Sequence, residues 1–520
     1  MRPSLLSLWG LLSFPPQFLG APTPLAAFLI YLTLTTTYRG AGAVNGLKRK
    51  VHFVGVGGIG MSGLAEVLLN LGYAVSGSDL RASEITRRLE FYGLRFCEGH
   101  DAANLQDADI LVVSAAVAED NVEVVAARER GLPVIHRSDL LADLMRLKPN
   151  AVVVGGTHGK TTTTSMISSI MDVANIGATS IVGGILHRSG TNARWGTGDY
   201  LVAEADEHDG SFLRLHPTIA VVTNIDAEHL EYYGDLAAIK KAFTQFCNGV
   251  PFYGYAILCG DDPNAATICQ DIQSVCLTYG LGEGCSLQGV NIALHRPPDM
   301  RSKSEEISAL RTRVDVIVHD ERLKLTGKLG TLDINALGLN NVRNALAACT
   351  VGLCLGMRFG LIAEGIRQFE GVQRRLQVCG EERGVIVIED YAHHPTEIAS
   401  TLEAVRWVEP GRLVVVFQPH LFSRTQYFFR EFAQVLSTAD RALVTDIYPS
   451  RERPIDGVDS GLIVTAAHES GAAHVTWQPD LWTVADHLAP ELREGDIVLI
   501  MGAGNINRIA PPLLEALRHL

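Results

Sequence analysis

The chain has 520 residues, of which 47% are hydrophobic and 19% are charged, and its formal net charge is −13 at pH 7. This length and composition predict about three folded domains and exclude a largely disordered polymer. The acidic balance argues against nucleic acid as the main partner, because binding to a phosphate backbone needs concentrated Lys and Arg, whereas a nucleotide pocket needs only local amide groups and one or two cations.

Residues 1–48 differ from the rest of the chain. Stretches 5–12 and 22–37 are apolar, which would fit a signal peptide or a membrane anchor. Prolines interrupt the apolar residues, and the second stretch falls short of the roughly 20 residues that a spanning helix needs. We therefore expect a disordered N-terminal tail without stable membrane insertion, and a cytoplasmic protein. Whether the tail is translated stays open.

Residues 49–149 alternate between strand and helix patterns, as in a parallel, doubly wound sheet. A strand pattern at 50–55 runs into Gly55-Val56-Gly57-Gly58-Ile59-Gly60, which matches GxGxxG, and Asp79 ends the next strand. Such a turn can bind the diphosphate of NAD or of a nucleotide sugar, or it can serve helix packing alone. We expect a Rossmann-like domain here, and the ligand of its turn stays open at this point.

Residues 150–372 begin with a buried strand pattern at 151–154, and a glycine-rich loop follows it directly. The expected phosphate-binding residues are Gly155, Gly156, Thr157, His158, Gly159, Lys160, Thr161 and Thr162. Glycines let backbone N–H groups converge on phosphate oxygens, Lys160 can reach the β- and γ-phosphates, and the Thr161 hydroxyl can ligate Mg²⁺. Gly155 stands four residues before Gly159 and not five, so the general phosphate-loop pattern is met only in part. The alternative is a glycine-rich turn with an accidental lysine.

Acidic and histidine residues follow two further strands of this domain. Glu204 to Asp209 comes after the strand at 200–204, and Asp226 to His229 comes after the strand at 218–223. The carboxyl ends of parallel strands share one crevice, so these residues should face the phosphate loop. Carboxylates there suit Mg²⁺, and His229 could hold a second cation. Solvated acidic loops are the alternative for Asp206, Glu207 and Asp209, and His208 is expected at the surface.

Residues 373–520 again show strand patterns, at 385–389, 413–417, 442–445 and 497–501, with helical stretches between them. The predicted fold is therefore α/β with three domains: a Rossmann-like first domain, a central domain like a P-loop ATPase and a Rossmann-like C-terminal domain. Within the central domain, the polar alternation at 301–332 predicts an antiparallel excursion. Nine scattered cysteines without a CxxC pair predict reduced, mostly buried thiols.

Several segments resemble the Mur ligases of peptidoglycan synthesis. In the central domain these are GTHGKTTT at 156–163, EADE at 204–207 and TNIDAEH at 223–229. Further matches are GLNNVRNALA at 338–347, where Asn340 stands in place of the usual His, DYAHHPTE at 390–397 and QPHLFSRT at 418–425. The resemblance covers nearly the whole chain beyond the tail. It implies an ATP- and Mg²⁺-dependent acid–amino-acid ligase that works through an acyl phosphate.

Other segments narrow the resemblance to one branch of the family. VGVGGIGMSGL at 54–64, GGI at 183–185, GTNA at 190–193 and PTIAVVTN at 217–224 resemble the branch that adds L-alanine to UDP-N-acetylmuramate. The branch that recycles murein tripeptide is the nearest alternative. Two other classes stay open: a nicotinamide oxidoreductase built on the first turn, and a non-catalytic nucleotide-binding protein.

The resemblance also implies roles for individual residues. Lys160 and His229 would be catalytic, and Thr161, Glu204 and His229 would hold metal. The base and ribose side of ATP would contact Asn341, Asn344, Arg375 and Asp390. The UDP-sugar would contact Gly57, Gly58, Ile59, Gly60, Asp79 and Asn192. The amino acid would contact Tyr391, His393 and Arg424. Because each domain would hold part of the reactants, we expect closure on binding, in a monomer or weak homodimer.

Overall fold

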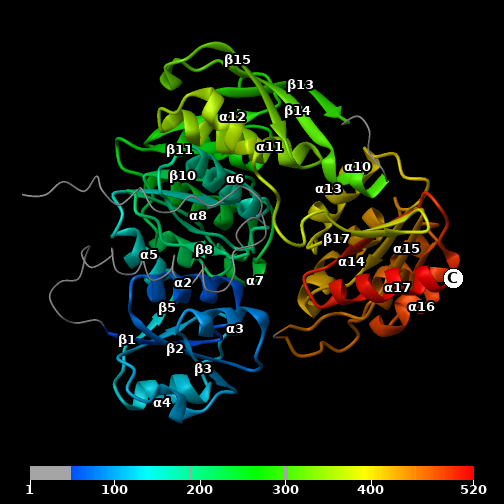
Figure 1. Cartoon of the computed structure of the whole chain (residues 1–520), viewed down its shortest axis with the longest axis horizontal. Helices are drawn as coiled ribbons and strands as arrows, with labels where there is room; N and C mark the ends of the chain where they lie inside the picture. The colour runs from blue at the N-terminus through cyan, green and yellow to red at the C-terminus, as the bar shows by residue number, and fades with distance from the viewer. Residues whose placement is uncertain (1–48, 188–189, 297–302, 451) are drawn as a thin grey trace, which may run out of the picture. The chain divides into compact units, whose positions relative to one another are not determined.

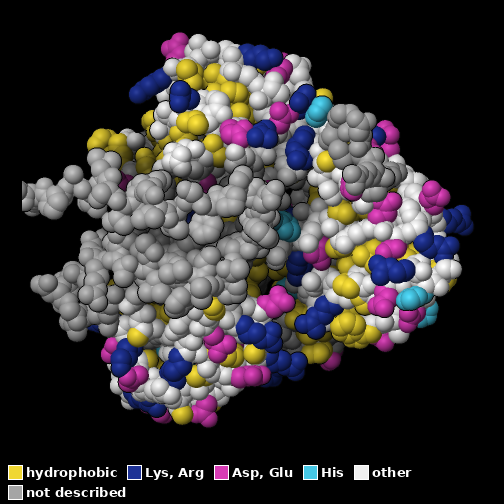
Figure 2. Space-filling view, in the orientation of Figure 1, with side chains coloured by type: hydrophobic (Ala, Val, Ile, Leu, Met, Phe, Trp, Pro, Cys, Tyr) yellow, Lys and Arg dark blue, Asp and Glu magenta, His cyan; other side chains and the backbone are white. Residues whose placement is uncertain are grey.

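The computed structural model describes residues 49–187, 190–296, 303–450 and 452–520. The expected N-terminal tail lies outside these residues. Within them, no helix combines the length and the apolar character that crossing a bilayer demands. On the face seen in Figure 2, basic and acidic side chains are both spread over the described surface.

The first sheet has five strands in the order β3-β2-β1-β4-β5, and all of them are parallel. Its strands are β1 (Lys50–Val54), β2 (Ala74–Asp79), β3 (Arg95–Glu98), β4 (Ile110–Val113) and β5 (Val134–His136). Its helices are α2 (Ile59–Asn70), α3 (Glu84–Phe91), α4 (Val122–Glu129) and α5 (Arg137–Met145). The strand order reverses between β1 and β4, and the glycine-rich turn stands at this switch point, where open α/β sheets bind ligands.

The second sheet has ten strands in the order β15-β14-β13-β12-β11-β10-β6-β9-β7-β8. Its parallel strands are β6 (Asn150–Gly155), β7 (Thr179–Ile181), β9 (Tyr200–Glu204), β10 (Ile219–Val222), β11 (Tyr255–Cys259) and β12 (Val275–Gly280). Antiparallel pairings involve β8 (Ala193–Arg194), β13 (Leu287–His295), β14 (Arg311–Val318) and β15 (Gly327–Ile334). The predicted antiparallel excursion is thereby confirmed.

Helices cover both faces of this second sheet. They include α6 (Lys160–Val173), α8 (Leu236–Asn248), α11 (Leu339–Cys354) and α12 (Phe359–Arg367). Helix α8 lies on one face and the other three helices lie on the opposite face. Helix α12 packs on α6 and on β15, as Figure 1 shows. A Cβ on Gly365 would lie 2.4 Å from the Ile170 Cα, so only glycine allows this close approach of α12 to α6. The position of α6 fixes the phosphate loop that precedes it.

The third sheet has six strands in the order β16-β17-β21-β18-β19-β20, of which β16 is antiparallel to its neighbour. Its strands are β16 (Gln377–Glu382), β17 (Val385–Asp390), β18 (Leu413–Phe417), β19 (Arg441–Val444), β20 (Val475–Trp477) and β21 (Ile497–Met501). Its main helices are α13 (Pro395–Arg406), α14 (Phe422–Leu436), α15 (Gly461–Glu469) and α17 (Ala510–His519). The three sheets confirm the predicted α/β class.

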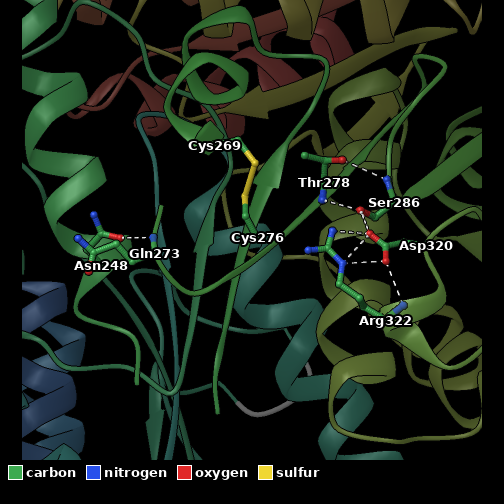
Figure 3. The surroundings of a disulfide bond; sticks show 8 residues. All are labelled: Asn248, Cys269, Gln273, Cys276, Thr278, Ser286, Asp320 and Arg322. Atoms are coloured by element: carbon green, nitrogen blue, oxygen red, sulfur yellow. Dashed lines mark hydrogen bonds and ion pairs between the residues drawn. A yellow bond between two sulfur atoms is a disulfide. The ribbon is translucent and has the colours of Figure 1, made fainter. Parts of the chain in front are cut away.

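One cysteine pair corrects the expectation of reduced thiols. Cys269 and Cys276 form a disulfide with a Cα–Cα distance of 6.3 Å, while the other seven cysteines are free (Figure 3). The short reversal between the two residues is held by the Gln273 N–H, which donates to the Asn248 Oδ1 at 2.8 Å. The sequence spacing of seven residues did not indicate this pairing, because only the reversal before β12 brings the two residues together.

Candidate active site

The phosphate loop joins β6 directly to α6. Its backbone requires glycine at two positions, Gly156 with φ 118° and Gly159 with φ 84°. A Cβ on Gly156 would lie 2.1 Å from the Thr223 Oγ1, and a Cβ on Gly159 would lie 2.6 Å from the Asn344 Oδ1. The two glycines therefore let the loop pack against the end of β10 and against α11.

Lys160 is the first residue of α6, and its side chain folds back over the loop. The Nζ donates to the carbonyl oxygens of Gly156 at 2.6 Å and Thr157 at 2.9 Å, and it pairs with the Glu207 Oε1 at 2.8 Å. Burial favours the neutral amine, but the Glu207 carboxylate outweighs it and raises the pKa of Lys160. The loop therefore carries a fixed positive charge. The sequence leaves open whether Glu207 is a site residue or part of a solvated loop. Its side chain is buried next to the Lys160 ammonium group.

Thr161 follows Lys160 and faces Glu204 at the end of β9. Its Oγ1 donates to the Glu204 Oε2 at 3.1 Å, and the Gly183 N–H donates to the Glu204 Oε1 at 2.6 Å. Burial raises the pKa of Glu204, although Gly183 and Lys160 counteract it. A hydroxyl and a carboxylate held side by side form the oxygen-rich donor set that Mg²⁺ prefers.

His229 lies at the start of α7 (Leu230–Tyr233), with its backbone in the left-handed region at φ 57°. Its Nδ1 is 2.9 Å from the Nδ1 of His208. His208, which the sequence placed at the surface, is therefore half-buried against His229. His229 borders the same cavity as Lys160 and Glu204.

A cavity of about 650 Å³ opens beside the loop, within the size range of small-molecule sites. The structure brings to it all the residues expected on the base and ribose side of ATP: Asn341, Asn344, Arg375 and Asp390. Asn344 donates to the Asn341 Oδ1 at 3.2 Å, and its own Oδ1 accepts from the Thr163 Oγ1 at 3.2 Å. Helix α11 is thus tied to α6 at the floor of this cavity.

A larger cavity, of about 920 Å³, lies on the other side of the loop. Residues of all three domains border it: Gly58, Ile59, Gly60, Asp79, Lys160, Glu204, His229, Tyr391, His393 and Arg424. Two predicted UDP-sugar residues, Gly57 and Asn192, are not among the residues that border this cavity. The Gly57 N–H donates to the Asp79 Oδ2 at 2.9 Å. Asn192 is buried behind the turn, where its Nδ2 donates to the Ile59 carbonyl at 2.6 Å and its Oδ1 accepts from Arg88 at 3.0 Å.

Two charged pairs of this larger cavity were missed by sequence reasoning. Arg137 pairs with Asp206, and a Cβ on Gly60 would lie 2.8 Å from the Arg137 Nη1, so the guanidinium stands at the glycine-rich turn. Arg424 donates to the Glu228 Oε1 at 2.6 Å. Burial opposes the charge of Glu228, but Arg424 together with the neighbouring histidines outweighs it and lowers the pKa of this carboxyl to about 2. Arg137 directly follows β5 at the carboxyl edge of the sheet, which is the signal that could have found it.

The sequence matches three family descriptions that together span most of the chain. These are "Mur ligase family, catalytic domain" over residues 50–149, "Mur ligase middle domain" over residues 154–352 and "Mur ligase, glutamate ligase domain" over residues 374–504. Each match falls on one of the three sheets.

Relatives of known name agree with these matches. The UDP-N-acetylmuramate–L-alanine ligase of Geotalea daltonii is 48% identical over 91% of this chain and 99% of its own length. The enzyme of the same name from Desulfotalea psychrophila is 46% identical over 90% of this chain and 98% of its own length. The crystal structure of UDP-N-acetylmuramate-alanine ligase MurC from Thermotoga maritima matches with a TM-score of 0.74 and 27% identity, over 90% of this chain and 98% of that one. The chain therefore belongs to the Mur ligase family.

Proposed function

We propose that this chain uses ATP to join L-alanine to the carboxylate of UDP-N-acetylmuramate. The names of its relatives support this activity. One observation of the site carries it: Lys160 and Thr161 are adjacent in the chain but border different cavities. A triphosphate in the smaller cavity would present its terminal phosphate to a carboxylate held in the larger one.

The reaction begins with activation of the carboxylate, because a carboxylate is a poor electrophile. Its oxygen attacks the γ-phosphorus of ATP, and the bond from this phosphorus to ADP breaks, which gives an acyl phosphate. Phosphoryl transfer depends on positioning and on charge neutralisation. The ammonium group of Lys160, fixed at the loop carbonyls, would supply that neutralisation.

Mg²⁺ fits the donor set beside the loop. The Thr161 hydroxyl and the Glu204 carboxylate would hold the ion, and it would add positive charge where the phosphate oxygens gather. His229 borders the same cavity as Glu204 and would ligate or orient a second cation. Glu204 and Thr161 hydrogen-bond to each other, so they are already close enough to share an ion.

The second half of the reaction takes place in the larger cavity. The amine of L-alanine attacks the acyl carbon, and the tetrahedral intermediate collapses to an amide while inorganic phosphate leaves. Arg424 would pair with the alanine carboxylate in bidentate fashion, which requires the substrate carboxylate to take the place of Glu228. His393 and Tyr391, which border the same cavity, would enclose the amino acid.

One assay tests this function against the other candidates. The purified protein is offered ATP and Mg²⁺ with a panel of amino acids, murein tripeptide and UDP-muramoyl acceptors, and ADP release is measured. We expect release only when both UDP-N-acetylmuramate and L-alanine are present. Release with tripeptide in place of alanine would move the chain to the recycling branch. ATP binding without turnover, or NAD(H) binding without ATP dependence, would contradict the proposal.

We further propose that the enzyme acts in the cytoplasm as a monomer or weak homodimer. A ligase that consumes ATP and a UDP-linked sugar works where both are supplied. Sedimentation at micromolar concentration tests the oligomeric state, and cell fractionation tests the location. A stable higher oligomer, or recovery of the chain with membranes, would contradict these two proposals.

A further inference from the structure

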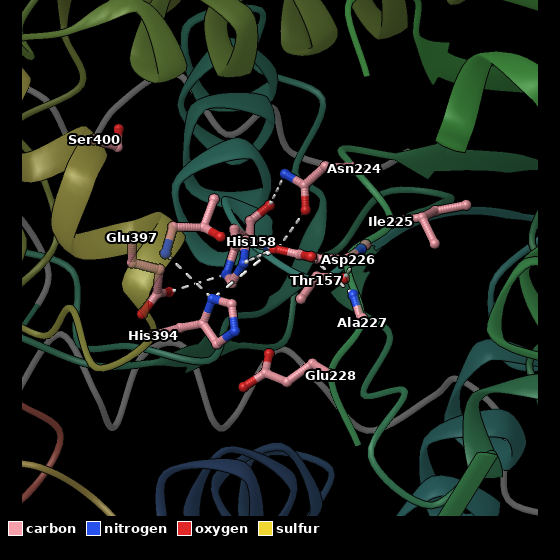
Figure 4. A network of polar contacts seen from close by, with 12 residues as sticks. Thr157, His158, Asn224, Ile225, Asp226, Ala227, Glu228, His394, Glu397 and Ser400 are labelled. Carbon is pink, nitrogen blue, oxygen red and sulfur yellow. Dashed lines mark hydrogen bonds and ion pairs between the residues drawn. The ribbon is translucent and has the colours of Figure 1, made fainter. Parts of the chain in front are cut away.

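A network of polar contacts joins the phosphate loop to the C-terminal domain. His158 of the loop stands between two carboxylates: its Nε2 is 3.5 Å from the Asp226 Oδ2, and its Nδ1 is 3.4 Å from the Glu397 Oε1 (Figure 4). Asp226 follows β10 in the central domain, and Glu397 lies in the first turn of α13. A second contact runs alongside, because the Thr396 Oγ1 donates to the Asp226 Oδ2 at 2.8 Å.

The loop side of this network is held firmly by its backbone. The His158 N–H donates to the Asn224 Oδ1 at 2.8 Å, and the His158 carbonyl accepts from the Thr223 Oγ1 at 2.6 Å. The Asp226 N–H donates to the Thr157 Oγ1 at 2.9 Å. The loop and the segment after β10 therefore form one unit, and the His158 ring extends from it towards α13.

The α13 side of the network reaches residues of both cavities. Glu397 accepts from the His393 N–H at 3.0 Å, and its Oε2 also lies 3.1 Å from the His393 Nδ1. The other oxygen of Glu397 is 3.8 Å from an Arg375 Nη1. Glu397 thus links His158 of the phosphate loop to one residue expected to face the amino acid and to one expected to face the nucleotide.

The same place could be taken for a metal site. Within the described ranges, His158, Asp226 and His394 offer ligand atoms that all lie within 4.8 Å of one another. Both ring nitrogens of His158 face carboxylates at ion-pair distance, however, and a protonated ring carries a hydrogen on each nitrogen and has no lone pair for an ion. Burial lowers the pKa of His158, but Asp226, Glu397 and Glu228 outweigh it and raise the pKa to about 9. His394 differs, since burial lowers its pKa to about 4. These contacts favour an ion-paired imidazolium over a metal ligand.

We propose that His158 is a positioning residue whose ring, held between Asp226 and Glu397, fastens α13 to the phosphate loop and so aligns the amino-acid side of the site with the transferred phosphate. We name this set of residues, His158, Asp226, Thr396 and Glu397, the loop–α13 latch. The inference rests on the proposed function for its kinetic consequences. Its structural consequence, an ion pair between two domains, is independent of any activity.

The kinetic test is a double-mutant cycle on the two ends of the latch. His158→Gln and Glu397→Gln should each lower kcat/KM for L-alanine by about tenfold to a hundredfold, the range expected for the loss of one buried charged contact, with a smaller change in KM for ATP. The double variant should be no worse than the poorer single variant, because both remove one contact. Losses that multiply in the double variant would overturn the proposal.

Thr396 provides a matched pair for the second contact. Thr396→Ser keeps the hydroxyl that donates to Asp226, and Thr396→Val removes it at nearly equal volume. The serine variant should stay close to the native kcat/KM for L-alanine, and the valine variant should lose severalfold. Equal losses in both variants would show that the methyl packing matters and not the bond to Asp226, which would contradict this part of the latch.

A thermal comparison tests the latch without using activity. The pKa of His158 is raised above the ordinary value of about 6.5, so its contribution to stability is complete below that pH and is lost as the pH rises through about 9. The difference in unfolding midpoint between the native chain and His158→Gln should therefore shrink between pH 6 and pH 10. The control His487→Gln changes an exposed histidine of the C-terminal domain and should show no such trend.

Two results would separate the possible failures. If the native chain releases no ADP with L-alanine, the proposed function fails, while the thermal comparison still decides the latch. If the native chain binds one equivalent of Zn²⁺ at micromolar concentration and His394→Gln abolishes this binding, the cluster is a metal site and the latch is overturned. A difference in unfolding midpoint between the native chain and His158→Gln that does not change with pH would also overturn the latch.

Discussion

The two glycine-rich turns of this chain begin from the same sequence logic and end in different chemistry. Each follows a buried parallel strand in the interior of its sheet, and each leads into a helix, α2 after Gly58 and α6 after Gly159. In the phosphate loop, the first two helical residues carry an ammonium group and a hydroxyl group. In the turn of the first domain, the corresponding residues are Ile59 and Gly60, and neither offers a charge.

Each turn also receives its charged partner from a different source. Lys160 belongs to the phosphate loop itself and is anchored on Glu207. At the first turn, the positive charge comes from Arg137, which follows another strand of the same sheet and pairs with Asp206 of the central domain. The backbone differs as well, because the residue before the helix is extended at Gly58 (φ −66°) and left-handed at Gly159 (φ 84°). The two turns therefore differ both in their glycine conformation and in the side chains that begin the following helix.

The largest expected effect comes from removing the loop charge. Lys160→Ala should lower kcat by about a thousandfold, because a fixed charge at the site of transfer is lost in a water-poor pocket. Binding of UDP-N-acetylmuramate should be nearly unchanged in calorimetry, since the first turn does not depend on this residue. Lys241→Ala, which changes an exposed lysine of α8, is the matched control and should leave turnover unchanged. Native turnover in Lys160→Ala would end the proposed mechanism.

A second prediction concerns the hydroxyl next to this lysine. Thr161→Val should lower kcat by about a hundredfold, because a ligand for Mg²⁺ is removed while the volume is kept. Thr161→Ser keeps the hydroxyl that now donates to Glu204, and it should remain within severalfold of the native rate. Initial rates over a Mg²⁺ titration provide the measurement. Similar Mg²⁺ dependence in the valine and serine variants would show that this hydroxyl does not hold the ion.

Much of the difference between the two turns could be predicted from the sequence, because the residues that cause it are close together in the chain. The strand, the glycines and the GKT start of α6 are contiguous, so the fold class and the cavity-facing loop residues follow from pattern and resemblance. Polar residues after β9 and β10 could be assigned to the same crevice, because parallel strands end at one edge.

The remaining features are long-range pairings that no local pattern encodes. Asn192, which the resemblance assigns to the UDP-sugar, is buried and donates to the Ile59 carbonyl, 133 positions away in the sequence. Arg424, which the resemblance assigns to the amino acid, donates to Glu228, 196 positions away in the sequence. Such partners depend on how domains pack, which periodicity and spacing do not report.

Gly58→Ala should have a smaller effect, and it distinguishes a contact with the ligand from a contribution to folding at the first turn. A Cβ on Gly58 would meet no atom closer than the Gly55 carbonyl oxygen at 3.4 Å, so Gly58→Ala should fold with a nearly native unfolding midpoint. If a diphosphate approaches the backbone here, the same Cβ should weaken UDP-N-acetylmuramate binding by about tenfold, with ATP binding unchanged. Gly360→Ala, at an exposed position of α12 with open space around it, is the control. Native UDP-sugar affinity in Gly58→Ala would place the diphosphate away from this turn.

The smallest expected effect concerns Asp79 and the use of the first turn. Its Oδ2 accepts from the Gly57 N–H at 2.9 Å, and its Oδ1 accepts from the Leu80 N–H at 2.8 Å. Asp79→Asn keeps one acceptor and turns an amide donor towards a backbone donor, so urea unfolding should show a loss of about 1 kcal/mol.

The same substitution separates two uses of a GxGxxG turn. In a dinucleotide-binding domain, the acidic residue at the end of the second strand binds the ribose of the cofactor, and its loss would reduce cofactor affinity strongly. Here the carboxylate is committed to the turn itself, so Asp79→Asn should change KM for the UDP-sugar by less than about fivefold, in line with one lost hydrogen bond. NAD(H) should bind neither variant nor native chain in a fluorescence titration. An affinity for NAD(H) that disappears in Asp79→Asn would mean that the first turn binds a nicotinamide cofactor and not the UDP-sugar.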